Sequence, residues 1–380
     1  MVHSPENHVS GRLFSPFRLG PLSLANRIVS LPLYLAYPDE DHLVNGLVLD
    51  YYREMARSGA GLVVVENVTV EPCGLGNPRT LLISEDRFIP GLARLAAAIR
   101  GQGVPAVLQI HHAGRYARRP DRIAPSAVAT WGAWPRAMGP EDILRVVEAF
   151  AAGARRAREA GFDGVELHGG TGYLLPQFVS PRTNLRQDGY GGDPERRMRF
   201  PLEVVAAVRA EVGVGFPVGY RFMAEEYVPG GLTLAEALPF AQALARAGVT
   251  YLSVMAGCYD AFPLPAYLEA DRREASMAPQ AQAVKQAVPG LPVIAAGRMQ
   301  TPAAAERVLE TGQADLVGLA RVLLADPLWP RKVREGREQA INPCAPGCTF
   351  CNQRLKDLRP AYCIRWPKPR IEAFLARVGG

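Results

Sequence analysis

The chain of 380 residues has no long apolar run, and this absence excludes a membrane-spanning helix. About 18 consecutive, mostly apolar residues are needed to cross a bilayer. The first residues, MVHSPENHVSGRLF, also lack the basic and then apolar order of a secretory signal. The hydrophobic content of 48% is that of a folded globular protein. We therefore expect a cytoplasmic protein with no membrane partner.

Lysine is scarce, and the basic residues form no block. Only four of the 43 Lys and Arg residues are lysine, and the arginines are dispersed among acidic residues along the whole chain. The net charge of +6 is therefore spread out. Because nucleic-acid binding usually requires a clustered basic face, this pattern argues against a nucleic-acid partner.

A Gly-x-Gly-x-x-Gly pattern after an early strand is missing too, which argues against a Rossmann domain. Instead, short β-branched runs alternate with amphipathic stretches, as in repeated βα units. Eight strands are predicted, at 27–33, 61–67, 104–110, 163–168, 216–222, 250–255, 291–296 and 314–320. Helical patterns lie between them, for example at 47–59, 140–161, 234–248 and 301–312. Eight such pairs favour an α/β fold with a closed (β/α)8 TIM barrel over an open doubly wound sheet.

Polar residues and glycines recur where the predicted strands end. They are Glu66, Asn67, Gln109, His111, His112, His168, Arg221, Gly257, Gly297, Arg298 and Arg321. Barrels of this type work at the C-terminal ends of their strands. The last two loops, AAGRM (295–299) and GLAR (318–321), lie where barrels commonly hold a phosphate with backbone N–H groups and an arginine. We therefore predict a phosphorylated cofactor or substrate.

Six cysteines are few, but four of them are clustered near the C-terminus. Cys344, Cys348, Cys351 and Cys363 follow the spacing Cys-x3-Cys-x2-Cys-x11-Cys. In a reducing compartment, such clusters are more often metal ligands or redox groups than disulfides. The spacing alone leaves zinc and an iron–sulfur cluster open.

Five separated blocks resemble the old yellow enzyme family of FMN-dependent oxidoreductases, in the family's order and over nearly the whole chain. The blocks are FSPFRLGPLSLANRIVSLP (14–32), QIHHAGR (109–115), DGVELHGGTGYLLPQFVSPRTNLRQDGYGGDPERRMRF (163–200), AAGRM and GLARVLLADP (318–327). The cysteines resemble those of the subgroup with 2,4-dienoyl-CoA reductase and trimethylamine dehydrogenase, which carry FMN in the barrel and a [4Fe-4S] cluster after it. The resemblance implies an FMN-binding barrel over 1–340 and a cluster-binding extension over 341–380, without those relatives' C-terminal dinucleotide-binding domains.

The resemblance also implies which residues hold the cofactor. The flavin ring would be lined or hydrogen-bonded by Pro32, Leu33, Asn67, Gln109 and Arg221. Arg221 would lie near N1 and O2 of the ring, where a guanidinium offsets the negative charge of the reduced flavin. The phosphate would be held by Gly297, Arg298, Ala320 and Arg321.

The segment HGGTGYLL after the fourth predicted strand would carry the chemistry. His168 matches the family residue that hydrogen-bonds the substrate oxygen, and Tyr173 matches the proton donor. Thr171 stands where the family has His or Asn, and a hydroxyl polarises an oxygen less strongly than an imidazole does. In an alkene reduction, FMN N5 would deliver hydride to Cβ and Tyr173 a proton to Cα. This implies an ene-reductase acting on a small enone, enoate or enoyl thioester.

We expect further substrate contacts from Tyr34, His112 and Tyr259. Adjacent side chains point apart in a strand, so His111 and His112 should not share one ligand. Segment 257–277 has the aromatic residues and prolines of a substrate lid, although an interface loop fits equally well. Segment 115–122, RYARRPDR, suits either an acidic substrate such as a CoA ester or a solvated basic loop.

Two other functions stay open at this point: an oxidative, amine-type dehydrogenase and an electron-transfer flavoprotein subunit. NADH or NADPH is the expected reductant. Because an iron–sulfur cluster passes one electron at a time, we hypothesise an electron partner such as a ferredoxin or an FAD-containing reductase. The family resemblance further implies a homo-oligomer.

Overall fold

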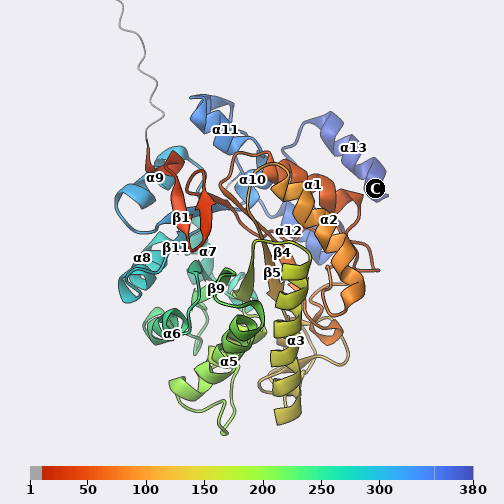
Figure 1. The fold of residues 1–380 in the computed structure, drawn as a ribbon, viewed down its shortest axis with the longest axis vertical. Coiled ribbons are helices and arrows are strands. Elements are labelled where there is room, and N and C mark those ends of the chain that lie inside the picture. The colour runs from red at the N-terminus through yellow and green to blue at the C-terminus, as the bar shows by residue number, and fades with distance from the viewer. Residues whose placement is uncertain (1–10, 346, 380) are drawn as a thin grey trace, which may run out of the picture.

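The structure is a computed structural model that describes residues 11–345 and 347–379. Its centre is a closed barrel of eight parallel strands (Figure 1). In order around the barrel they are β3 (Ile28–Ser30), β4 (Leu62–Thr69), β5 (Ala106–His111), β8 (Gly164–Gly169), β9 (Val218–Glu225), β10 (Tyr251–Ala256), β11 (Val293–Ala295) and β12 (Leu316–Leu319). Each overlaps one of the predicted strands. The expected (β/α)8 barrel is therefore confirmed.

The helices surround the barrel and bury one face each against it (Figure 1). They are α1 (Gly46–Ala56), α2 (Ile89–Arg100), α3 (Pro140–Glu159), α5 (Pro194–Val212), α6 (Leu234–Arg246), α8 (Ala278–Ala287), α9 (Pro302–Glu310) and α10 (Arg321–Ala325). Local sequence sets several starts: Asn45 accepts the N–H of Val48 at 3.1 Å, and Thr233 forms a reciprocal capping box with Glu236. With helices on the outside and packed side chains inside, strands β4, β5, β8 and β10 are buried at every position.

A short hairpin closes one end of the barrel. It consists of β1 (Phe17–Leu19) and β2 (Leu22–Leu24). Leu19 and Leu24 are buried in a cluster with Leu62 and Leu316, the first residues of β4 and β12. This apolar plug fills the N-terminal end of the strands, so the opposite, C-terminal end is left for polar groups.

Two insertions border that C-terminal end. The lip (residues 112–139) carries the two-residue strands β6 (Ile123–Ala124) and β7 (Arg136–Ala137). The cap (residues 257–277) carries α7 (Pro265–Arg272), in which no residue is buried. The helix α4 (Leu174–Val179) lies between them in sequence and is buried throughout.

The C-terminal tail (residues 341–379) packs against α1, as Figure 1 shows for α13 (Lys368–Val378). The ring of Phe374 lies 5.7 Å from that of Tyr37, and Arg370 makes a bidentate ion pair with Glu54 at 2.9 and 2.7 Å. The helices α11 (Trp329–Arg334) and α12 (Phe350–Lys356) precede it. The segment that bears the four cysteines is therefore fastened to the barrel at its far end.

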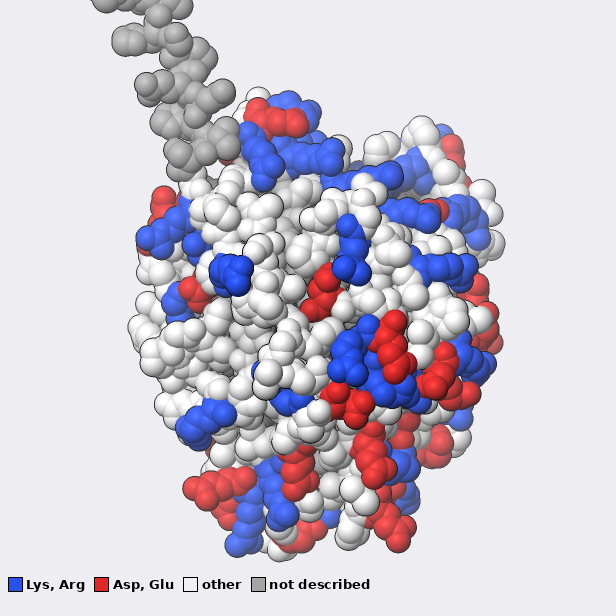
Figure 2. All heavy atoms as spheres, viewed as in Figure 1, with Lys and Arg blue, Asp and Glu red and all other residues white. Residues whose placement is uncertain are grey.

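Charges are mixed over most of the face in Figure 2, with basic side chains gathered over its upper part near α11 and α13. A groove of about 600 Å³ there lies between α1 and α13. Its lining includes five arginines and two acidic residues: Arg53, Arg57, Arg331, Arg370, Arg377, Asp50 and Glu54. Among the helices of the described residues, none is both long enough and apolar enough to cross a membrane.

Candidate active site

His168 and Tyr173 lie together at the C-terminal end of β8. Their rings are 4.9 Å apart and perpendicular. His111, at the end of β5, also lies next to Tyr173, with its ring at 5.0 Å, and its ring is 6.0 Å from that of His168. All three side chains are more than nine-tenths buried. The site therefore places two imidazoles and one phenol in a small, dry space.

His168 is a neutral hydrogen-bond donor. Burial lowers its pKa well below the usual value, and the charges of His111 and Arg221 lower it further. Its Nδ1 accepts the backbone N–H of Gly170 at 3.2 Å, so its proton is on Nε2. A neutral imidazole with a free Nε2–H can polarise a substrate oxygen without first losing a proton.

The Tyr173 hydroxyl is linked to the cap. Its oxygen lies 2.7 Å from the hydroxyl of Tyr259. Burial raises the pKa of Tyr173 well above its usual value, and Tyr259 adds to this shift. Burial raises the pKa of Tyr259 as well. Both phenols therefore hold their protons at neutral pH, as a proton donor and its neighbour must.

Thr171 is directed elsewhere. Its backbone adopts a left-handed conformation, with φ at 60°, and its hydroxyl donates toward Met255 Sδ at 3.6 Å. The loop between His168 and Tyr173 thus presents the imidazole and the phenol, whereas the threonine hydroxyl contacts a sulfur.

The structure places His112 in a polar cluster beside Glu71. Its Nε2 lies 3.0 Å from Glu71 and 3.5 Å from the thiol of Cys73, away from Tyr173. Instead, His111 faces Tyr173, and its Nε2 contacts Thr69 at 2.9 Å. The two side chains point apart as strand geometry requires, but the sequence did not show which one faces the site.

Glu71, Cys73 and His112 form the one group of three metal-ligating side chains, within residues 11–345 and 347–379, whose ligand atoms all lie within 4.8 Å. Gly114 donates its N–H to His112 Nδ1 at 3.0 Å, so the proton of this ring is on Nε2. That nitrogen has no lone pair free for an ion. Arg145 also pairs with Glu71. We interpret the group as a hydrogen-bonded cluster.

The wall of the barrel mouth is formed by the segment after β3. Pro32, Leu33 and Tyr34 are half-buried, whereas their neighbours Leu31 and Leu35 are buried. The Tyr34 hydroxyl donates to the carbonyl oxygen of Arg79 at 3.1 Å. Tyr34 also contributes to the raised pKa of Tyr173.

Buried charges lie beneath the mouth. Gln109 donates its amide to Glu166 at 2.7 Å, and Arg221 donates to Ser253 at 2.7 Å. Burial raises the pKa of Glu166, and the charge of Arg221 lowers it. Within the part of the chain that the structure describes, Glu166 Oε2 is buried without a hydrogen bond, although Tyr251 is close enough to lower the pKa of Glu166. We did not predict Glu166 as a site residue, although an acid within the apolar run DGVELH was a signal.

Two arginines converge at the ends of β11 and β12. Arg298 and Arg321 both approach the carboxylate of Asp271 on the cap, at 3.2 and 3.7 Å. Gly297, directly before Arg298, has φ at 93°, and a Cβ there would meet Ser276 Oγ at 2.4 Å. The arginine pair therefore already holds an anion, the Asp271 carboxylate. Asn67 lies elsewhere at the mouth, with its side-chain amide 3.3 Å from His111 Nε2.

Glu66, which we placed among the strand-end polar residues without giving it a role, is a second buried acid. It accepts the backbone N–H of Leu35 at 3.2 Å. Burial raises its pKa from 4.5 to about 8. The folded protein therefore keeps a proton that the unfolded chain loses above pH 4.5. The stability due to this protonated group is fully present below that pH and declines as the pH rises toward about 8.

We predict that the Glu66→Gln variant removes this pH dependence. Its amide oxygen can still accept the Leu35 N–H, but it has no proton to lose. The wild-type free energy of unfolding should fall by up to about 1.4 kcal/mol per pH unit more steeply than that of the variant between roughly pH 5 and 8. Urea unfolding at several pH values measures this difference. Parallel curves would show that the carboxyl is ionised in the folded protein.

The four tail cysteines are free, partly buried thiols. Burial raises the pKa of Cys351, Arg321 lowers it, and Cys344 raises it further. Burial likewise raises the pKa of Cys363, to which the charges of Cys344 and Cys348 add. The sulfurs thus lie in one neighbourhood, next to the arginine that also approaches Asp271.

The chain is similar to known proteins over most of its length. The model of the family described as NADH:flavin oxidoreductase / NADH oxidase matches residues 12–340. An NADH oxidase of Thermoanaerobacter brockii is 40% identical over 372 residues, which are 94% of this chain and 56% of that protein. An NADPH dehydrogenase of Geobacillus sp. (strain WCH70) is 38% identical over 330 residues, 84% of this chain and 92% of that one.

Solved structures agree with these matches. A 2-naphthoyl-CoA reductase in complex with 2-naphthoyl-CoA has a TM-score of 0.89 and 29% identity, over 94% of this chain and 57% of that one. The chain therefore spans little more than half the length of this reductase and of the NADH oxidase.

Proposed function

The chain belongs to the NADH:flavin oxidoreductase / NADH oxidase family, and from that membership we propose that it is an FMN-dependent enzyme that reduces a C=C bond conjugated to a carbonyl or thioester. The observation that carries the proposal is the pairing of a neutral imidazole, His168, with a protonated phenol, Tyr173, at 4.9 Å between the rings. A substrate with a carbonyl oxygen that accepts a hydrogen bond and a carbon atom that accepts a proton would use both the imidazole and the phenol.

The residues at the barrel mouth fit FMN. Arg298 and Arg321 already converge on one anionic group, the Asp271 carboxylate, and would hold the phosphate in its place. Gly297 and Ala320 would lie beside the phosphate. Arg221 and Gln109 would bind the polar edge of the ring, with Pro32, Leu33 and Asn67 beside it. When bound, FMN supplies the hydride that none of these side chains can provide.

The chain's own residues would supply the rest of the reaction. His168 donates its Nε2–H to the substrate oxygen and so stabilises the negative charge that develops there. Tyr173 gives its proton to the α-carbon. Tyr259 is within hydrogen-bond distance of Tyr173 and would stabilise the phenolate left behind. Because the site is buried, water does not compete for these hydrogen bonds.

An anaerobic titration tests the reaction type. We expect the reduced holoprotein to be reoxidised by cyclohex-2-enone or by an enoyl-CoA, with one flavin oxidised per alkene consumed. Cyclohexanone, which has the carbonyl but no C=C bond, is the control and should leave the flavin reduced. Indifference to every activated alkene, together with reduction of the oxidised flavin by an amine under argon, would contradict the proposal and favour an oxidative dehydrogenase.

We also propose a [4Fe-4S] cluster on Cys344, Cys348, Cys351 and Cys363. Thiolates that share one zinc ion lie at about 2.3 Å from it, which in tetrahedral geometry puts the sulfurs about 3.8 Å apart. No three tail thiols of the described residues form a group within 4.8 Å. A wider set of four thiolates suits a cluster better than a single ion.

The electron route is part of the proposal. NADH or NADPH would reduce the enzyme, consistent with the names of its relatives. The charge of Arg321 interacts with Asp271 at the proposed phosphate site and also with Cys344 and Cys351, which supports a cluster close to the proposed flavin site. A ferredoxin or an FAD-containing reductase would exchange single electrons with the cluster, and self-association into a homo-oligomer stays an expectation from the family.

A further inference from the structure

The tip of the lip is a tight turn that exposes a tryptophan. Thr130 and Ala133 exchange two backbone hydrogen bonds, at 2.9 and 3.0 Å, across Trp131 and Gly132. Both central residues have positive φ, 49° for Trp131 and 75° for Gly132. A bulky residue rarely adopts this conformation, and such strain is often found at functional sites. Trp131 is nevertheless 54% exposed, so burial does not account for it.

The Trp131 ring ends a row of aromatic rings that begins at the proposed catalytic pair. Its centroid lies 5.0 Å from that of Tyr116 and 5.6 Å from that of Tyr259. Tyr259 in turn hydrogen-bonds Tyr173 at 2.7 Å, beside His168. A ligand that reacts at His168 can therefore extend along this row and reach solvent at Trp131.

Basic groups border the outer end of this row. The Arg118 guanidinium lies 5.6 Å from the centre of the Trp131 ring. Arg118 has no ion-pair partner among the residues that the structure describes, whereas its neighbour Arg119 pairs with Asp121. A flat apolar ring beside an unpaired guanidinium matches a ligand that has both a planar ring and an anionic group.

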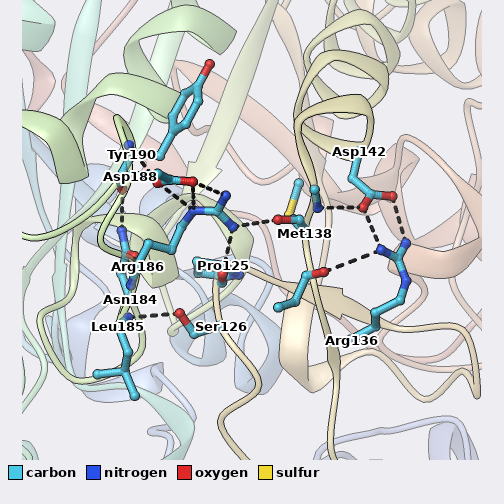
Figure 3. A network of polar contacts seen from close by, with 12 residues as sticks. Pro125, Ser126, Arg136, Met138, Asp142, Asn184, Leu185, Arg186, Asp188 and Tyr190 are labelled. Atoms are coloured by element: carbon cyan, nitrogen blue, oxygen red, sulfur yellow. Dashed lines mark hydrogen bonds and ion pairs between the residues drawn. The ribbon is translucent and has the colours of Figure 1, made fainter.

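The two arms of the lip that lead to this turn are fastened by a polar network, which Figure 3 shows. Arg186 donates to the carbonyl oxygens of Pro125 at 3.0 Å and Met138 at 2.6 Å, and so joins the two arms of the lip. Arg136 makes a bidentate pair with Asp142 at 2.6 and 2.7 Å. The position of Trp131 is therefore set by the fold.

The cap side of the row is fastened as well. Asp260, next to Tyr259, accepts hydrogen bonds from Arg115 and from Arg182, the latter at 2.6 Å. Burial raises the pKa of Asp260, but the hydrogen bond from Arg182 and the charge of Arg115 outweigh it, so the pKa is lowered. An ionised Asp260 between two arginines keeps Tyr259 between Trp131 and Tyr173.

We propose that Trp131 and Arg118 bind the adenine nucleotide end of a ligand whose other end lies at His168 and Tyr173, which rests on the proposed function of that pair. The base stacks on the exposed part of the indole ring, and the phosphates pair with Arg118, whose guanidinium lies over that ring. Stacking on an aromatic ring suits a purine, and a guanidinium suits a phosphate. NADH, NADPH and CoA thioesters share this adenosine diphosphate unit, so the site takes the unit common to the three.

Direct binding tests the proposal without turnover. Isothermal titration calorimetry measures the binding of ADP, and of its 2′-phospho and 3′-phospho derivatives, to the holoprotein. The Trp131→Asn variant removes the ring but tolerates positive φ, and it should bind about tenfold more weakly, within the range that stacking supplies. Trp131→Phe should stay within about threefold of wild type, because it keeps a ring. Trp134→Asn is the matched control, since Trp134 is 71% exposed and lies outside the row.

Arg118→Lys separates charge from shape and should weaken the nucleotide less than Arg118→Gln does. Tighter binding of the 2′-phospho derivative, with a raised KM for NADPH in Trp131→Asn, identifies the ligand as the reductant NADPH. Equal binding of all three nucleotides, with a raised KM for NADH, identifies it as the reductant NADH. Preference for the 3′-phosphate, with a raised KM for an enoyl-CoA, identifies the substrate.

Equal nucleotide affinity of wild type and Trp131→Asn would overturn the proposal. So would a change in oligomeric state without a change in affinity, which would make the turn a contact between copies. Nucleotide binding that depends on Trp131 can be found even if no alkene is reduced, so the two failures are distinguishable.

Discussion

The Tyr173→Phe variant should lose roughly 100- to 10,000-fold in kcat for alkene reduction, which is the usual contribution of a positioned general acid. The phenylalanine ring keeps the packing against His168 and His111, whose centroids lie 4.9 and 5.0 Å from that of Tyr173. Only the hydroxyl is removed, and with it the proton source for the α-carbon.

Stopped-flow measurement of the two half-reactions checks this expectation. Reduction of the oxidised enzyme by NADH or NADPH should proceed at close to the wild-type rate, whereas reoxidation by cyclohex-2-enone should be slow. Tyr259→Phe is the matched control, because Tyr259 only hydrogen-bonds the donor, at 2.7 Å, and its loss should cost much less. An undiminished rate of alkene reduction in Tyr173→Phe would remove Tyr173 from the proposed mechanism.

The Cys351→Ser variant should lose nearly all of its iron and acid-labile sulfide, of which the wild type should contain about four each per chain. A serine hydroxyl stays protonated and is a poor ligand for iron, so this single replacement leaves the proposed cluster with only three of its four ligands. Cys351 packs against the core cluster, but a serine there changes little volume. We expect the flavin to remain bound, since its proposed ligands lie on the barrel strands or directly after them, outside the tail.

Metal and sulfide analysis after anaerobic purification measures the loss, and the visible spectrum reports the flavin separately. The Cys73→Ser variant is the matched control, because Cys73 is also a partly buried thiol but bonds Glu71, away from the tail. One zinc ion per wild-type chain, or full iron in Cys351→Ser, would contradict the cluster on these cysteines.

The barrel itself was predictable because its signals are local. The spacing of apolar residues predicts the strands and helices, and capping residues such as Asn45 and Thr233 predict where helices begin. The pair His168 and Tyr173 was also accessible, since both belong to one strand and the loop that follows it. Glu66 and Glu166 were given no role from the sequence. The sequence around an acid in an apolar strand is the same whether its carboxyl is fully buried or reaches solvent.

The sequence by itself determined a (β/α)8 barrel, the grouping of polar residues at its strand ends and the clustering of four cysteines, since these depend on order and spacing along the chain. Only the tertiary structure decided that His111, not His112, faces Tyr173, that Tyr259 comes back to hydrogen-bond Tyr173 from 86 residues away, and that Trp131 completes the row of rings. The reason is physical: alternation along a strand states that two neighbours point apart, but the register of that strand in the closed barrel determines which of them points inward.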